Sequence, residues 1–152
     1  MIEKEELLSL VPHRGKMLLM NKVLSYNLEE QSIEAEYHIS EDCLFYDSAA
    51  RGVPAWVGFE CIAQTISALS GIRGKEKGAP PKTGFILAVS KLRIELPFYK
   101  TGSVLTIKSK EIESEYPVYI FGGEIFLGGK KALEGKITVM EVDNENEKRE
   151  IE

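Results

Sequence analysis

Val53-Pro54-Ala55-Trp56-Val57-Gly58-Phe59-Glu60-Cys61-Ile62-Ala63-Gln64-Thr65-Ile66-Ser67-Ala68-Leu69-Ser70-Gly71 is the most apolar run of the chain. A proline suits the first turn of a helix and a glycine suits the position just after its end, so we expect one helix over 53–71. A helix that is apolar on nearly every face is buried. Glu60 stands in its middle without a Lys or Arg within one turn, and a buried carboxylate is costly unless it is paired or used.

The rest of the chain is patterned mainly as strands. Apolar and polar residues alternate in most of these stretches, which is the period of a half-buried strand. A short N-terminal helix over 1–10, ended by Pro12, precedes them, and a charged Gly/Pro loop over 73–84 follows the apolar helix. The predicted strands lie at 18–24, 32–39, 85–96 (with a bend near 91), 103–112, 118–126 and 131–141.

This order predicts an α+β fold in which one antiparallel sheet wraps around one long central helix. Such a sheet encloses the helix, which explains why it is apolar on most faces. We expect a single domain over 1–152, with residues 143–152 forming a frayed, charged tail.

Composition excludes several classes of function. The chain has 152 residues, 43% hydrophobic and 28% charged, and a formal net charge of −5, which argues against binding to nucleic acid or an anionic membrane. The acidic N-terminus is unlike a signal peptide, and 53–71 is too short and too polar to span a bilayer. Two cysteines and two histidines at unrelated spacings give no metal site. We therefore expect a cytoplasmic protein.

Four blocks of the chain resemble the hotdog-fold 3-hydroxyacyl-[acyl-carrier-protein] dehydratases of the FabZ type. Residues 10–24, with Pro12-His13-Arg14, resemble the family's "L-x-P-H-R" opening, and Pro54, Glu60, Ala63 and Gln64 match its central helix. Residues 87–93 and 97–102 resemble the two blocks that follow. The detailed form, with "P-H-R-G-x-M" and "V-P-A-W-V-G-F-E", is most similar to the ApeP-like branch associated with aryl polyene clusters. The resemblance implies a two-layer hotdog fold.

One position departs from the family pattern. In typical members a catalytic histidine precedes the helix glutamate in "G-H-F-P-G", and the matching position here is Tyr46. His13 and His38 are the only histidines of the chain. The family's usual base is therefore missing from its usual place.

Glu60 is the strongest candidate for a catalytic residue. A carboxyl group that burial desolvates can donate or take a proton near neutral pH, and the resemblance assigns the matching glutamate to the departing β-hydroxyl. Gln64, one turn later, is expected either to orient Glu60 by a hydrogen bond or to be a plain surface residue. His13 is the candidate base for the α proton, although a capping or packing role in the turn is the simpler interpretation. For His38 we expect an ordinary strand position.

The remaining candidates are expected to contact substrate. The phenol of Tyr46 can hydrogen-bond a thioester or hydroxyl, or can simply pack. Gly52 and Val53, at the predicted helix start, would present amide groups to a thioester oxygen. Trp56 and Ala88 complete the substrate-binding set, with core or interface packing as the alternative for Trp56.

The resemblance implies a 3-hydroxyacyl-thioester dehydratase of fatty-acid or aryl polyene type biosynthesis, which eliminates water to the 2-enoyl thioester. Two alternatives stay open: a non-catalytic or half-catalytic subunit of a complete hotdog dehydratase, and a hotdog acyl thioesterase. No metal or organic cofactor is expected. The substrate would arrive on the phosphopantetheine of acyl carrier protein or on coenzyme A. A homodimer or higher homo-oligomer, or a hetero-oligomer with another hotdog dehydratase, is expected.

A basic stretch follows the predicted helix on an otherwise acidic chain. Such a stretch would attract an acidic carrier protein, although an ordinary solvated loop is the simpler interpretation. Its residues are Arg73, Lys75, Lys77 and Lys82.

Overall fold

The computed structural model describes residues 1–79 and 83–142. Lys82 and the tail 143–152, on which two of the expectations above rest, lie outside the described residues. The elements in chain order are α1 (Lys4–Leu7), the 3₁₀ turn η1 (Gly15–Met17), β1 (Lys22–Asn27), β2 (Ser32–His38), β3 (Gly52–Pro54), α2 (Val57–Glu76), β4 (Thr83–Ile94), β5 (Phe98–Lys100), β6 (Val104–Glu115), β7 (Val118–Leu127) and β8 (Lys130–Val142).

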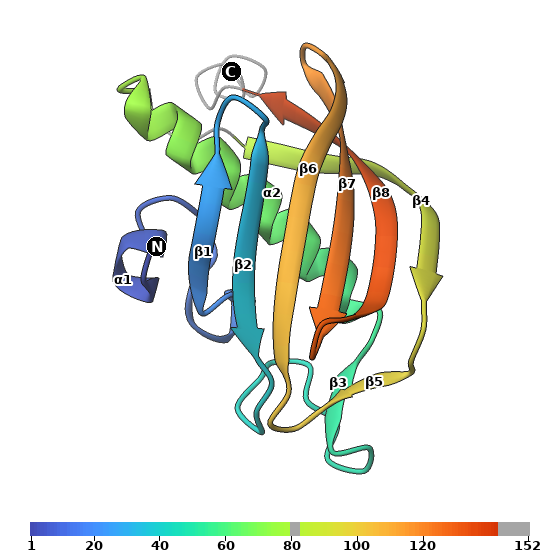
Figure 1. The fold of residues 1–152 in the computed structure, drawn as a ribbon. Helices are drawn as coiled ribbons and strands as arrows, with labels where there is room; N and C mark the ends of the chain where they lie inside the picture. Colours follow the sequence, from blue (N-terminus) through green and yellow to red (C-terminus); the bar gives the residue numbers. More distant parts are fainter. Residues whose placement is uncertain (80–82, 143–152) are drawn as a thin grey trace, which may run out of the picture.

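One long sheet curves around one long helix. Six antiparallel strands follow the order β1-β2-β6-β7-β8-β4, and α2 crosses the inner face of this sheet (Figure 1). A second, two-stranded sheet of β3 and β5 lies at one end of the molecule. The predicted α+β hotdog architecture is confirmed.

Alternation along the strands places the core between sheet and helix. In β6, Leu105, Ile107 and Ser109 are buried, whereas the side chains between them are more exposed. The Ser109 hydroxyl lies 2.7 Å from the hydroxyl of Thr65 on α2, so even the polar member of this inner row is satisfied. Gly123 of β7 lets the sheet approach α2 closely, because a Cβ there would lie 2.5 Å from the side chain of Ile62.

The helix prediction was right in kind and wrong at both ends. Pro54 lies in β3 rather than in the first turn, and α2 begins at Val57. Gly71 is an interior residue of α2, which runs on to Glu76. Gly71 does not end the helix; it allows the helix to approach the segment that contains Leu10. A Cβ at position 71 would lie 2.2 Å from the carbonyl oxygen of Leu10.

The N-terminal region also differs from the prediction. The helix expected over 1–10 is the short α1, and the first strand begins at Lys22 rather than near residue 18. Leu18, Leu19 and Met20 are buried without forming a strand. Their apolar pattern therefore indicates that these residues are buried, and it does not indicate that they form a strand.

β4 is an edge strand with unusual exposure. It pairs with β8 on one side only, and its bend at Lys91 has a left-handed φ of 52°. Apolar side chains on both of its faces are exposed, up to 52% for Leu87. The large apolar side chains exposed on β4 are those of Phe85, Ile86, Leu87, Val89, Leu92 and Ile94.

Candidate functional site

A groove of about 640 Å³ runs between α2, the N-terminal segment and the start of β4. It brings together three of the sequence-predicted residues, namely Glu60, Gln64 and His13. Along α2 its floor continues through small side chains, Ala63, Ser67 and Ser70. The two serines were not among the predicted residues.

The turn that carries His13 is fixed by its neighbour Arg14. One guanidinium nitrogen donates to the carbonyl oxygens of Val11 (2.7 Å) and His13 (2.8 Å), and another donates to that of Leu8 (2.6 Å). These carbonyls follow α1 and have few helical partners, so a single side chain satisfies them. Arg14 therefore holds His13 against the groove.

His13 itself has an unusual environment. Its Nδ1 is buried and has no hydrogen-bond partner within the described residues. Burial, and secondarily the positive charge of Arg14, lowers the pKa of the imidazole below its usual value. The ring is therefore held toward its neutral form, which has a nitrogen lone pair free to accept a proton.

Gln64 has partners other than the one expected. Its Oε1 accepts from the amide of Leu19 (2.7 Å), and its Nε2 donates to the carbonyl of Met17 (2.8 Å). The amide therefore ties α2 to the segment after His13 rather than orienting Glu60. Its role in the structure is to position the wall of the groove.

Glu60 lies half-buried on the face of α2 that borders the groove. The expectation of a fully enclosed carboxylate is wrong for the single chain, because no element of the described structure covers this face completely. Trp56, one turn earlier, is 47% exposed and packs against the rings of Phe45 (5.4 Å between centroids) and Phe59 (6.4 Å). Ala88 lies exposed on β4, outside the groove.

Tyr46 lies in a different place from Glu60. It borders a separate hollow at the β3–β5 end, and its hydroxyl lies 3.3 Å from Thr101 Oγ1. Gly52 and Val53, expected at the helix start, instead pair with Lys100 and Tyr99 in the β3–β5 ladder. Their amide groups are therefore not at the first turn of α2, and this part of the expectation is wrong.

The predicted basic stretch does not act as one unit. The first two of its residues are paired: Arg73 lies 3.1 Å from Glu141 (5% exposed) and donates to Gln31, and Lys75 lies 3.5 Å from Glu6. The Arg73–Glu141 pair, which no sequence signal revealed, sits near the far end of the groove, where Glu141 contributes to the lining.

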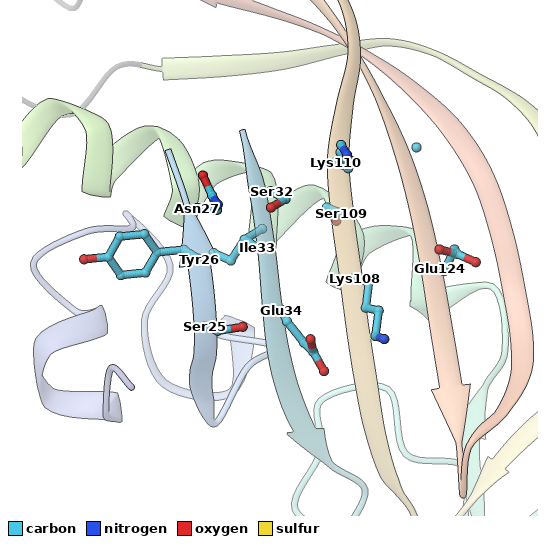
Figure 2. Close-up of a pocket in the computed structure, with 11 residues that line it drawn as sticks. Ser25, Tyr26, Asn27, Ser32, Ile33, Glu34, Lys108, Ser109, Lys110 and Glu124 are labelled. Carbon is cyan, nitrogen blue, oxygen red and sulfur yellow. The ribbon is translucent and has the colours of Figure 1, made fainter. Parts of the chain in front are cut away.

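Another hollow, on the opposite face of the sheet, lacks the features of a reaction site. It crosses β1, β2, β6 and β7, and Glu34, Lys108 and Glu124 extend from it on the side away from α2 (Figure 2). Its charges are mixed and it contains neither Glu60 nor His13. Residues 1–79 and 83–142 hold no cluster of acidic, histidine or cysteine side chains suited to a metal ion. In the same ranges, no helix is long and apolar enough to cross a membrane.

Comparison with known families identifies the chain. Residues 5–150 match the family described as ApeP-like, ApeP dehydratase. The chain belongs to the ApeP-like dehydratase family. The resemblance derived from the four sequence blocks is thus confirmed over nearly the whole chain.

Individual relatives of this ApeP-like chain agree with the assignment. It is 29% identical to the 3-hydroxyacyl-[acyl-carrier-protein] dehydratase FabZ of Chlamydia trachomatis serovar L2, over 93% of this chain and 94% of that protein. A solved structure, the dehydratase heterocomplex ApeI:P from Xenorhabdus doucetiae, matches with a TM-score of 0.84 at 23% identity, covering 95% and 96% of the two chains.

The same fold also occurs in a protein with a different description. A hypothetical thioesterase from Streptococcus pneumoniae, crystallised with coenzyme A, matches with a TM-score of 0.62 at 13% identity, covering 80% of this chain and 85% of that one. At this identity the match shows that the two proteins share a fold, and it shows nothing more.

Proposed function

We propose that this ApeP-like chain is a 3-hydroxyacyl-thioester dehydratase, or the Glu60-bearing subunit of one, and that it converts its substrate to the 2-enoyl thioester. Family membership supports the reaction class. The observation that carries the assignment to residues is that Glu60 and His13 border the same groove. A base and an acid on two sides of one cavity are what an elimination of water needs.

In the proposed step, the neutral imidazole of His13 takes the proton from the α carbon of the thioester. The electron pair of that C–H bond forms the C=C bond, and the C–O bond to the β-hydroxyl breaks. The carboxyl group of Glu60 gives its proton to the leaving hydroxyl, which departs as water. A proton passed from His13 back to Glu60 restores both groups. The balance requires no oxidant, and we propose that no metal or organic cofactor takes part.

A second subunit is part of the proposal. The exposed apolar edge β4 and the exposed Trp56 are surfaces that soluble proteins commonly cover. We propose that another hotdog chain covers them, either a second copy or a different dehydratase. The description of the Xenorhabdus relative as a heterocomplex supports the second arrangement.

The half-catalytic alternative is supported by a feature of the sequence. In the sequence resemblance, Tyr46 matches the position of the family histidine, and a phenol is a poor base at neutral pH. If His13 is not the base, a histidine from a partner chain would complete the site, and Glu60 would still contribute the acid.

Product analysis tests the proposal and separates it from thioester hydrolysis. Purified protein, alone and co-purified with a hotdog partner, is incubated with a 3-hydroxyacyl thioester of acyl carrier protein and of coenzyme A. Mass spectrometry then follows the thioester. We expect loss of one water with the acyl chain retained on its thiol. Release of free thiol would support a thioesterase, and an inert protein in both preparations would contradict the proposal.

A further inference from the structure

The far end of the groove that holds Glu60 contains a buried carboxylate at a position where the strand pattern favours an apolar side chain. On β8 the inner row runs through Ile137 and Val139, and Glu141 continues it at only 5% exposure. Both Val139 and Glu141 line the groove. A buried carboxylate is costly unless it is paired, and Arg73 of α2 lies 3.1 Å from it.

Several contacts hold the Arg73–Glu141 pair in place. One guanidinium nitrogen of Arg73 donates to Oε1 of Glu141, and the other donates to the side-chain oxygen of Gln31 at 2.7 Å. The guanidinium carbon lies 5.6 Å from the centre of the Tyr119 ring. The backbone amide of Glu141 donates to the carbonyl oxygen of Pro117 at 3.0 Å. The charged pair is therefore a fixed feature of this end of the groove.

The pair lies at a definite distance from Glu60. Ser70 lines the groove ten residues after Glu60 on the same helix, and Arg73 follows about one turn later. A helix rises 1.5 Å per residue, so Glu60 and Ser70 are about 15 Å apart along its axis. The lining that α2 and β8 contribute between Glu60 and Glu141 is uncharged and consists of Ala63, Gln64, Ile66, Ser67, Ser70 and Val139.

We propose that the Arg73–Glu141 pair sets the length of the apolar acyl chain that the groove accepts. The inference rests on the proposed function, which places the reacting end of the acyl group beside Glu60. Each methylene group that the groove buries before the chain reaches Glu141 strengthens binding. A methyl end that reached Glu141 would remove solvent from a charged carboxylate and offer it no hydrogen bond, so longer chains gain nothing further or bind more weakly.

The pair can be removed without leaving a buried charge behind. Replacing both partners of a buried ion pair by apolar side chains of similar volume is often neutral or stabilising, whereas removing one partner strands the other. The test variant is therefore Arg73→Met/Glu141→Leu. Glu141→Gln is a second variant, which keeps the shape of the side chain and an oxygen that accepts from Arg73 but removes the negative charge. Both are compared with the wild type in the same association state.

The test measures binding and involves no turnover. Its probes are amide analogues of saturated acyl-pantetheines, which have neither a β-hydroxyl group to lose nor a thioester to hydrolyse, and their chains lengthen by two carbons at a time. In calorimetry, the affinity of the wild type should rise by up to roughly fourfold per methylene and then stop rising. In Arg73→Met/Glu141→Leu the rise should continue, with roughly tenfold tighter binding of the first chain beyond the wild-type limit. Glu141→Gln should move the limit in the same direction by less.

Lys131→Met/Glu134→Leu is the matched control. It makes a similar exchange in an exposed ion pair of the same strand, where the two side chains lie 2.9 Å apart outside the groove. This variant should keep the wild-type limit. A wild type whose affinity rises through the whole series, or that binds none of the probes, would overturn the proposal. So would a limit that stays at the same chain length in both Arg73→Met/Glu141→Leu and Glu141→Gln.

Failure of this inference is distinguishable from failure of the dehydratase assignment. Dehydration of 3-hydroxyacyl thioesters by a protein whose binding shows no length limit would leave the assignment standing and remove the role of the ion pair. A length limit that moves in Arg73→Met/Glu141→Leu, in a protein that dehydrates nothing, would do the reverse.

Discussion

At the scale of single residues, Gln64 makes the most consequential contact near the groove. Its side chain is buried and bonds to backbone groups at both Met17 and Leu19. Gln64→Ala should lower the free energy of unfolding by about 2–3 kcal/mol, because a buried amide and a carbonyl lose their partner. Urea denaturation measures this loss. Ser67→Ala, on the same face of α2, is the control and should change stability by less than about 1 kcal/mol.

His13 gives the residue-scale prediction for pH. The folded protein lowers the pKa of this imidazole, so the unfolded chain binds more protons just below its ordinary value. The free energy of unfolding should therefore fall as the pH drops from about 6.5 toward 5. In His13→Gln this part of the dependence should be missing. Equal slopes for the wild type and His13→Gln across this window would contradict the environment described for His13.

The residues at the groove show how much of the site could be predicted from the sequence. The resemblance picked out Glu60, and of the two histidines only His13 lies in a block that resembles the family; the structure places Glu60 and His13 at one groove. The partners of Gln64 could not be predicted, since they lie 45 and 47 residues away along the chain. For the same reason, Arg73 was interpreted as part of a solvated or docking stretch, whereas it pairs with Glu141 on β8.

At the scale of elements, the position of α2 depends on Gly71. Alanine forms helices better than glycine by about 1 kcal/mol, so Gly71→Ala would stabilise an isolated helix. Here the new Cβ would meet the carbonyl oxygen of Leu10 at 2.2 Å, and backbone cannot move away cheaply. We expect a net destabilisation of roughly 1–3 kcal/mol, measured by thermal or urea unfolding.

Gly84→Ala is the control for this substitution. A Cβ at Gly84 meets nothing within 4 Å, so alanine there should leave stability unchanged or slightly higher. If Gly71→Ala behaved like Gly84→Ala, the close contact between α2 and the segment after α1 would be wrong.

The presence of each helix and strand was easier to predict from the sequence than the residues at which it begins and ends. The strands of the second half alternate strongly, and the structure places β6, β7 and β8 within a few residues of the prediction. Pro54 and Gly71 were interpreted as helix ends because local propensity assigns them there. Tertiary contacts decided otherwise: Pro54 pairs with Phe98 across β3 and β5, and Gly71 packs against Leu10.

At the scale of the whole molecule, the exposed edge β4 predicts association. Leu87→Glu places a charge in the middle of the apolar edge and should shift the protein toward a monomer, as measured by light scattering with size exclusion. Ile112→Glu is the control, since Ile112 is also highly exposed (53%) but lies on β6, in the interior of the sheet. An association state that responds equally to both variants would contradict the role of β4.

The central claim is that Glu60 supplies the acid for elimination of water from a 3-hydroxyacyl thioester. The most direct measurement is the dehydration rate of Glu60→Gln beside the wild type, in whichever assembly makes the wild type active and with matched stability and association state. We predict a fall in kcat of roughly 10²- to 10⁴-fold, because the amide has the shape of the acid without its transferable proton. Dehydration at the wild-type rate by Glu60→Gln would contradict the claim.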